Sequence, residues 1–160
     1  MMNLVSSTDK ILTTPCSKFE FDNPPFDPVV FSQELVKTMY DNNGLGISAN
    51  QVGSPYQILA MRGDPENFVC FNPKLLTVSN EEIVLEETSL SYPGLIVKVK
   101  RPQHIRVRFA APNGEIMTKQ FTGLTARTFQ QQLDFLSGIV YYNRANRYHR
   151  DKALRNWRNK

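Results

Sequence analysis

Residues 123–138, GLTARTFQQQLDFLSG, decide the fold of this chain. Apolar residues at a 4-3-4 spacing form one helical face, namely Phe129, Leu133, Leu136 and Val140. Gln131 and Phe135 fall together on the other side of the same helix, one turn apart. The spacing predicts a helix from about Thr125 to Tyr142, and the aromatic residue opposite the core stripe predicts that this helix is buried on two sides.

Short β-like segments precede this helix. Residues 57–61, 96–99 and 105–109 are rich in apolar and β-branched side chains and are separated by Pro or Gly turns. Apolar and polar residues alternate in the last two segments, which predicts antiparallel strands with one solvated face.

A first helix is predicted to begin at Asp27-Pro28, an N-cap residue followed by Pro at the first helical position. Its apolar stripe is Phe31, Leu35 and Met39, and it is predicted to end at residues 42–44, Asn-Asn-Gly, which tolerate a left-handed cap. Prolines predict loops in the first thirty residues. Two helices and several antiparallel strands make the fold class α+β.

Length and composition favour one globular domain, because 160 residues with 41% hydrophobic side chains can bury a single core. No apolar run is long enough to span a bilayer, so we expect a cytoplasmic protein with no membrane partner. The two cysteines permit no disulfide framework, and we expect reduced thiols. We also expect a monomer.

The basic charge is concentrated in the tail. Residues 144–160 hold seven Lys or Arg against one acid, so residues 1–143 carry a net −2 of the chain's +4. The division predicts a domain over 1–143 and a basic tail over 144–160. Such a tail can contact phosphate, as on the ribosome, or it can be a solvated helix end that keeps the protein soluble.

Three segments in order resemble the signature motifs of the peptide deformylase family. They are residues 44–53, GLGISANQVG; residues 86–94, EETSLSYPG; and residues 123–138. The resemblance implies antiparallel strands packed around a buried central helix, which carries an H-E-x-x-H motif in the family. It also implies hydrolysis of N-formylmethionine by a water bound to Fe²⁺, Zn²⁺ or Ni²⁺.

The resemblance fails at the positions that hold the family's metal and its general base. Ser89 stands at the cysteine position, Gln131 and Phe135 at the two histidine positions, and Gln132 at the glutamate position; Thr88 replaces a glycine. Serine and glutamine bind these metals weakly, phenylalanine offers no ligand, and a glutamine amide cannot shuttle a proton near neutral pH. We therefore expect no metal, no cofactor and no hydrolysis, with the Phe135 ring in the space of the second histidine.

Other site residues of the family are retained. Gln51 and the Leu90 N–H match its oxyanion donors, and Asp134 is expected to make a helix or loop hydrogen bond. Residues that match substrate-binding positions are Gly46, Ile47, Tyr92, Pro93, Gly94 and Arg101. Each of these can instead be retained for packing.

The sequence leaves several functions open. The first is a metal-free pseudoenzyme that binds peptide N-termini or the ribosome. The second is an active metal-dependent deformylase that removes the N-formyl group from nascent proteins through ligands outside the motifs. The third makes Ser89 a nucleophile, although no neighbouring base is evident. The changes can also be engineered rather than natural.

Overall fold

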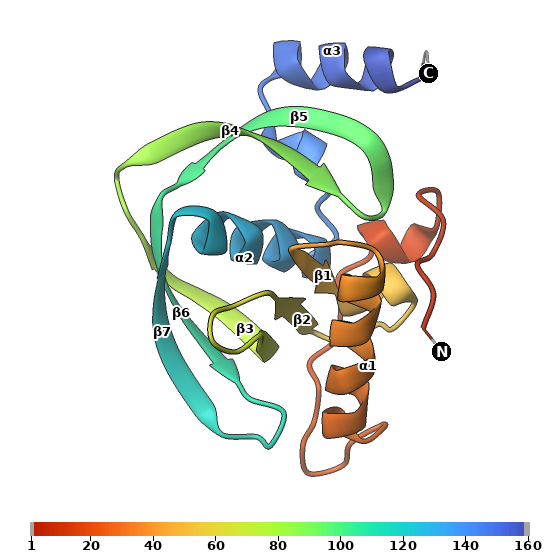
Figure 1. Cartoon of the computed structure of the whole chain (residues 1–160), viewed down its shortest axis with the longest axis vertical. Helices are drawn as coiled ribbons and strands as arrows, with labels where there is room; N and C mark the ends of the chain where they lie inside the picture. Colours follow the sequence, from red (N-terminus) through yellow and green to blue (C-terminus); the bar gives the residue numbers. More distant parts are fainter. Residues whose placement is uncertain (1, 159–160) are drawn as a thin grey trace.

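The computed structural model describes residues 2–158, and α2 (Gly123–Leu136) lies at the centre of the molecule (Figure 1). A five-stranded sheet covers one side of α2, and a two-stranded ribbon covers the other. The sheet has the order β1 (Gly46–Ser48), β2 (Ile58–Met61), β3 (Phe68–Val78), β6 (His104–Ala110), β7 (Ile116–Thr122), and the ribbon pairs β4 (Glu82–Ser89) with β5 (Tyr92–Pro102). All strand pairs are antiparallel, which confirms the predicted α+β class.

Both faces of α2 are buried, as the periodicity predicts. Phe129 and Leu136 pack on the sheet with the side chains of β6. Phe135 packs on the opposite side with Val97 and Val99 of β5. The helix therefore holds the sheet and the ribbon together as one body.

The helix α2 is shorter than predicted, because it ends at Leu136 and not near Tyr142. Gly138 adopts a left-handed φ of 77°, and a Cβ there would lie 2.8 Å from the carbonyl oxygen of Thr13. The Leu136 carbonyl accepts a hydrogen bond from the Cys16 N–H at 2.8 Å. The N-terminal segment thus caps the helix, and Val140 joins the core from outside it.

The helix α1 (Pro28–Asp41) has the predicted ends. Asp27 accepts hydrogen bonds from the Val29 and Val30 N–H groups, and Asn43 takes the left-handed conformation after the last turn. Two 3-10 turns, η1 (Lys10–Thr13) and η2 (Ala49–Val52), lie among the loops. The residues after β1 therefore return toward the N-terminal segment, where Val5 N–H bonds the Gln51 carbonyl.

The described part of the basic tail is a helix, α3 (Arg147–Arg158), which packs on β5 at the top of Figure 1. Ala153, Leu154 and Trp157 face the apolar cluster of the ribbon, and the Trp157 Nε1–H donates to the Pro93 carbonyl at 2.9 Å. The expected boundary after residue 143 falls inside the turn η3 (Tyr141–Arg144).

The sequence also predicted no membrane-spanning segment and two reduced cysteines. Within residues 2–158 no helix is long and apolar enough to cross a membrane. Cys16 and Cys70 are both free thiols. Burial raises the pKa of the Cys16 thiol to about 11 and also raises the pKa of Cys70, so both favour the protonated form.

Candidate functional site

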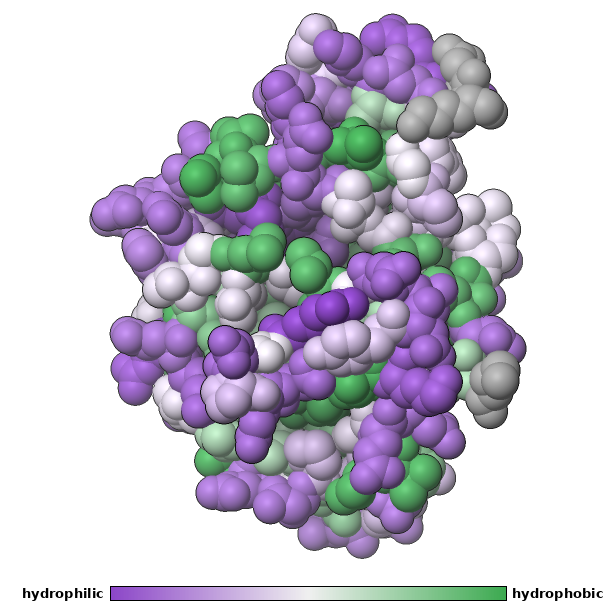
Figure 2. All heavy atoms as spheres, in the orientation of Figure 1, coloured by the Kyte–Doolittle hydropathy of each residue, from purple (hydrophilic) through white to green (hydrophobic). Residues whose placement is uncertain are grey.

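A cavity of about 430 Å³ lies where the segment leading into β1, the end of β4 and one face of α2 converge. Its walls come from residues 43–46, residues 86–90, Gly94 and five residues of α2, namely Leu124, Arg127, Thr128, Gln131 and Gln132. The neighbouring ribbon exposes Ile83, Val84 and Leu85, and Figure 2 shows a hydrophobic patch over the ribbon at the upper left. Polar and apolar side chains therefore both line the cavity, and exposed apolar side chains of the ribbon lie beside it.

The Gln131 side chain is fully engaged at the first histidine position. Its Nε2 donates to the Thr88 carbonyl at 2.9 Å and to Glu87 Oε1 at 3.4 Å. Its Oε1 accepts from Gln132 Nε2 at 3.2 Å. Gln131 is only 7% exposed, and its amide offers a metal ion a neutral carbonyl oxygen that already accepts one hydrogen bond, in place of the imidazole nitrogen of a histidine.

The other two ligand positions do not supply metal donors either. Ser89 Oγ accepts from the Ser91 N–H at 3.3 Å and from Gln51 Nε2 at 3.4 Å. The Phe135 ring is fully buried in the apolar cluster of the ribbon and does not line the cavity. Within residues 2–158, moreover, no three His, Cys, Asp or Glu side chains gather in a way that could hold a metal ion. This donor set does not fit Fe²⁺, Zn²⁺ or Ni²⁺.

Gln132, at the glutamate position, borders the cavity and is only 2% exposed. Its Nε2 donates to Gln131, whereas its Oε1 has no hydrogen-bond partner among residues 2–158. A Cβ on Gly46 would lie 2.6 Å from Thr128 Cγ2 and 3.1 Å from Gln132 Cγ. The glycine therefore lets β1 approach α2 closely enough to hold Gln132 in place.

The two expected oxyanion donors differ in position. Leu90 lines the cavity. Gln51 is fully buried behind the cavity wall, with its Oε1 bonded to the Ser48 N–H at 2.9 Å and its Nε2 bonded to Ser91 Oγ at 2.8 Å. The Gln51 amide thus braces the turn after β4 and does not project into the cavity.

Two of the six residues expected to bind substrate line the cavity, namely Gly46 and Gly94. Ile47 is buried among the side chains of α1 and β2. Tyr92 packs against Tyr141 and Trp157, and burial raises the pKa of the Tyr92 hydroxyl to about 12. These two side chains therefore belong to the packing beside the site.

Pro93 and Arg101 also lie outside the cavity wall. The Pro93 carbonyl accepts the Trp157 hydrogen bond. Arg101 is buried, with Nε 2.5 Å from Glu87 Oε2 and Nη1 2.9 Å from Asp134 Oδ2. The buried carboxylates of Glu87 and Asp134 therefore occupy the Arg101 guanidinium, which was expected to bind substrate.

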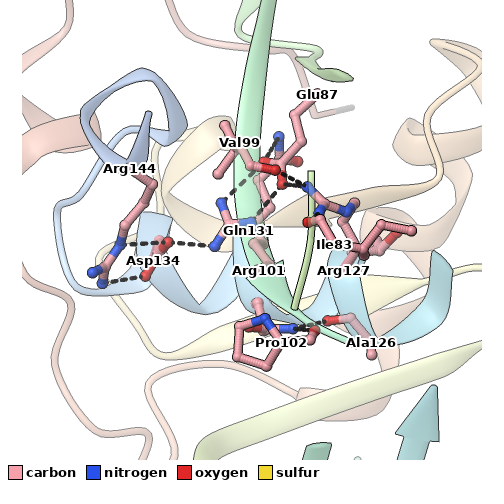
Figure 3. A network of polar contacts seen from close by, with 12 residues as sticks. Ile83, Glu87, Val99, Arg101, Pro102, Ala126, Arg127, Gln131, Asp134 and Arg144 are labelled. Atoms are coloured by element: carbon pink, nitrogen blue, oxygen red, sulfur yellow. Dashed lines mark hydrogen bonds and ion pairs between the residues drawn. The ribbon is translucent and has the colours of Figure 1, made fainter. Parts of the chain in front are cut away.

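An ionic cluster joins the buried side chains of Glu87, Arg101, Arg127 and Asp134 to the exposed Arg144 (Figure 3), and Glu87 and Arg127 line the cavity. Arg127 also contacts Glu87, and Arg144 Nη2 reaches Asp134 Oδ1 at 2.9 Å. Burial lowers the pKa of Arg127, and it would lower that of Arg101, but hydrogen bonds and charge from Glu87 and Asp134 outweigh burial and raise it. Asp134, which was expected to make a helix or loop hydrogen bond, therefore makes ion pairs with Arg101 and Arg144.

The motifs did not single out Glu87, Arg127 or Arg144 for this cluster. The sequence did hold one indication of a buried ion pair: Arg127 lies within a helix that the periodicity predicts to be buried on two sides. A buried arginine requires acceptors, which here are the Glu87 carboxylate, the Val99 carbonyl and the Ile83 carbonyl.

Comparison with known proteins agrees with this arrangement. The family model for polypeptide deformylase matches residues 1–151. A peptide deformylase of Microchaete diplosiphon is 30% identical over 143 residues, which are 86% of this chain and 75% of the relative.

Solved structures share the fold over nearly the whole chain. A peptide deformylase from Synechococcus elongatus superposes with a TM-score of 0.89 at 26% identity, over 97% of this chain and 86% of that one. The peptide deformylase of Thermus thermophilus superposes with a TM-score of 0.92 at 24% identity, over 99% of this chain and 94% of that one. Since the family match extends through the sheet, the ribbon and the central helix, the chain belongs to the polypeptide deformylase family.

Proposed function

We propose that this chain binds peptide N-termini in the cavity between β1, β4 and α2 and does not hydrolyse the formyl group. The observation that carries the proposal is the Gln131 amide, which is bonded to the Thr88 carbonyl at the position where the family needs a metal ligand. Hydrolysis of a formamide needs an activated water and a base to manage its proton. Gln131 and Gln132 supply neither.

The backbone around the cavity supports binding of an extended peptide. In the described chain β1 pairs only with β2, and β4 pairs only with β5, so both are edge strands, and both border the cavity. An edge strand offers backbone N–H and C=O groups to an added strand. A peptide N-terminus laid between β1 and β4 would therefore complete both sheets.

Apolar side chains at the cavity rim support recognition of an apolar first residue. Leu45 is 50% exposed and Leu124 is 60% exposed, and both line the cavity. Burying one such side chain against a peptide contributes roughly 1.5–3 kcal/mol. A methionine side chain fits this chemistry because it is apolar and flexible.

Two measurements test the proposal on the purified full chain. Isothermal titration with formyl-Met-Ala-Ser is expected to show binding, and liquid chromatography of the same mixture is expected to show formyl turnover near background. Added Zn²⁺, Ni²⁺ or Fe²⁺ is expected to leave the rate unchanged. Robust, chelator-sensitive deformylation would overturn the proposal and establish the active deformylase instead.

A matched pair of variants locates the binding surface. Leu124→Ala removes an exposed leucine from the cavity rim, whereas Ile116→Ala removes a 65% exposed isoleucine on β7, outside the cavity. Only Leu124→Ala is expected to weaken peptide binding. Equal affinities for the two variants would place the peptide elsewhere on the protein.

A further inference from the structure

A second hollow, of about 310 Å³, lies on the outer face of the five-stranded sheet, the face directed away from α2. Ile105 and Val107 of β6 pack in the core with α2, so the alternate residue Arg108 points away from that helix. The hollow lies between residues 18–22 of the N-terminal segment and residues of β3, β6 and β7. It shares no lining residue with the cavity beside α2. We propose that this hollow binds a nucleoside monophosphate.

Two cations form one end of the hollow. Lys74 of β3 and Arg108 of β6 are direct register partners, so their side chains leave the same face of the sheet. Both are exposed, and neither side chain forms an ion pair or a hydrogen bond with any of residues 2–158. Like charges that face each other across two strands repel, and a bound anion offsets this repulsion. A phosphate monoester suits the pair, because it carries a charge of about −1.5 to −2 at pH 7 and three acceptor oxygens.

Apolar side chains form the part of the hollow next to the cations. Phe21 is half-buried, and its ring packs edge-on against Phe19 with 4.9 Å between the centroids. Ile116 is 65% exposed on β7 and is the register partner of Ala110. Ala110 lies two residues beyond Arg108 on the same face of β6, which is about 7 Å along the strand. A flat base can therefore lie on the apolar part while its phosphate reaches the cations, because a ribose spans a gap of this size.

Two carboxylates, Glu20 and Asp22, line the hollow from the N-terminal segment. Neither forms an ion pair with residues 2–158, so both can accept hydrogen bonds from hydroxyl groups of a ligand, as carboxylates do from ribose in dinucleotide sites. The Asn72 side chain accepts from the Phe19 N–H at 2.8 Å and donates to the Phe19 carbonyl at 2.9 Å, which fixes this wall on β3. An inorganic anion would use only the cations, whereas a nucleoside monophosphate uses both walls.

Isothermal titration of the full chain with AMP, adenosine and inorganic phosphate tests the proposal. AMP is expected to bind at least about tenfold more tightly than adenosine or phosphate, because each of these fills only one part of the hollow. Absence of AMP binding, or an equal affinity for either fragment, would overturn the proposal. Displacement of AMP by formyl-Met-Ala-Ser would also overturn it, because the nucleotide would then lie in the cavity beside α2.

Two neighbouring arginines of β6 locate the phosphate. Arg108→Gln removes an exposed cation that lines the hollow, whereas Arg106→Gln removes an exposed cation from the same face of the strand, outside the hollow. Arg108→Gln and Lys74→Gln are each expected to weaken AMP binding about tenfold or more, and Arg106→Gln is expected to leave it unchanged. Equal AMP affinities for Arg106→Gln and Arg108→Gln would overturn the proposal. Circular dichroism checks that each variant is folded.

Discussion

Gln131 Nε2 lies 2.9 Å from the carbonyl oxygen of Thr88, the residue that precedes Ser89 at the end of β4. A single hydrogen bond therefore ties the middle of α2 to the strand that carries another ligand position of the family. The bond thus engages the Gln131 amide between two elements that carry metal-ligand positions in the family.

Restoring the metal site requires several changes at once. We expect Ser89→Cys, Gln131→His, Gln132→Glu and Phe135→His together to bind about one equivalent of Zn²⁺ and to regain part of the deformylase activity, because three ligands and the base act as a unit. Inductively coupled plasma mass spectrometry and formyl-peptide turnover measure the two effects.

The Phe135→His change has a separate consequence. Phe135 is fully buried among apolar side chains of the ribbon, so its replacement alone is expected to lower the free energy of unfolding by roughly 3 kcal/mol. Zn²⁺ is expected to recover stability only in the quadruple variant. Metal-dependent activity in any triple variant would contradict the view that the site acts as a unit.

The buried carboxylate of Glu87 is expected to be essential for stability. Its side chain is 3% exposed and pairs with two buried arginines. Glu87→Gln leaves Arg127 without a carboxylate partner and Arg101 with Asp134 alone, and it is expected to cost about 3–5 kcal/mol in urea denaturation. Asp41→Asn breaks the exposed pair with Lys37 and serves as the control, with a cost below about 1 kcal/mol. Similar costs for the two variants would refute this assignment.

Stability is expected to fall at alkaline pH through the buried tyrosines. Burial raises the pKa of Tyr92 to about 12, and it raises that of Tyr141, from an ordinary value of 10.0. A folded-state pKa above the unfolded one gives stability that is complete below pH 10 and is lost as the pH rises through the folded-state pKa. Thermal unfolding between pH 9 and 12 measures this loss.

Tyr141→Phe isolates the contribution of one hydroxyl. The change removes the 2.7 Å hydrogen bond to the Leu95 carbonyl, so it is expected to cost about 1 kcal/mol at pH 7 and to flatten the alkaline decline. Tyr148→Phe, at a 65% exposed position on α3, is the control. An unchanged slope in Tyr141→Phe would show that other groups cause the decline.

The thiols are expected to react slowly in the native protein. Since burial raises the pKa of Cys16 to about 11 and raises that of Cys70, little thiolate exists at pH 8. Ellman's reagent is expected to modify both cysteines rapidly only after unfolding in guanidinium. Fast, stoichiometric reaction of the native protein would mean that the N-terminal segment opens readily.

The outer face of α3 is expected to bind a polyanion such as ribosomal RNA. The helix packs through Ala153, Leu154 and Trp157, which leaves its basic residues toward solvent. Neutralising three exposed cations by Arg147→Gln, Lys152→Gln and Arg155→Gln is expected to weaken sedimentation with ribosomes and to lower its salt dependence.

A control variant with the same loss of positive charge tests whether ribosome binding depends on the α3 surface or only on the net charge of the protein. Lys74→Gln, Arg106→Gln and Arg108→Gln remove three exposed cations from the sheet, on elements other than α3. Equal sedimentation of the two triple variants would mean that α3 has no special role, and retention of the fold is checked by thermal unfolding.

Local signals in the sequence were sufficient to predict where α1 lies, that α2 is buried, and which family the chain belongs to. Asp27 and Pro28 start α1 because a cap acts within one helical turn, and the spacing around Phe129 buries α2 because periodicity follows from helix geometry. The three ordered motifs indicated the deformylase fold, which the family match confirms.

Contacts between residues that are distant in the sequence determined the end of α2 and the roles of the buried polar side chains. The end of α2 depends on the Cys16 N–H and the Thr13 carbonyl, so apolar spacing alone placed it too late. Arg101 pairs with Glu87 and Asp134 although it matched a substrate-binding position, and Gln51 bonds Ser91 although it matched an oxyanion donor. A buried polar side chain takes its role from the partners that the fold brings within hydrogen-bonding distance, whereas caps and periodicity need only near neighbours in the chain.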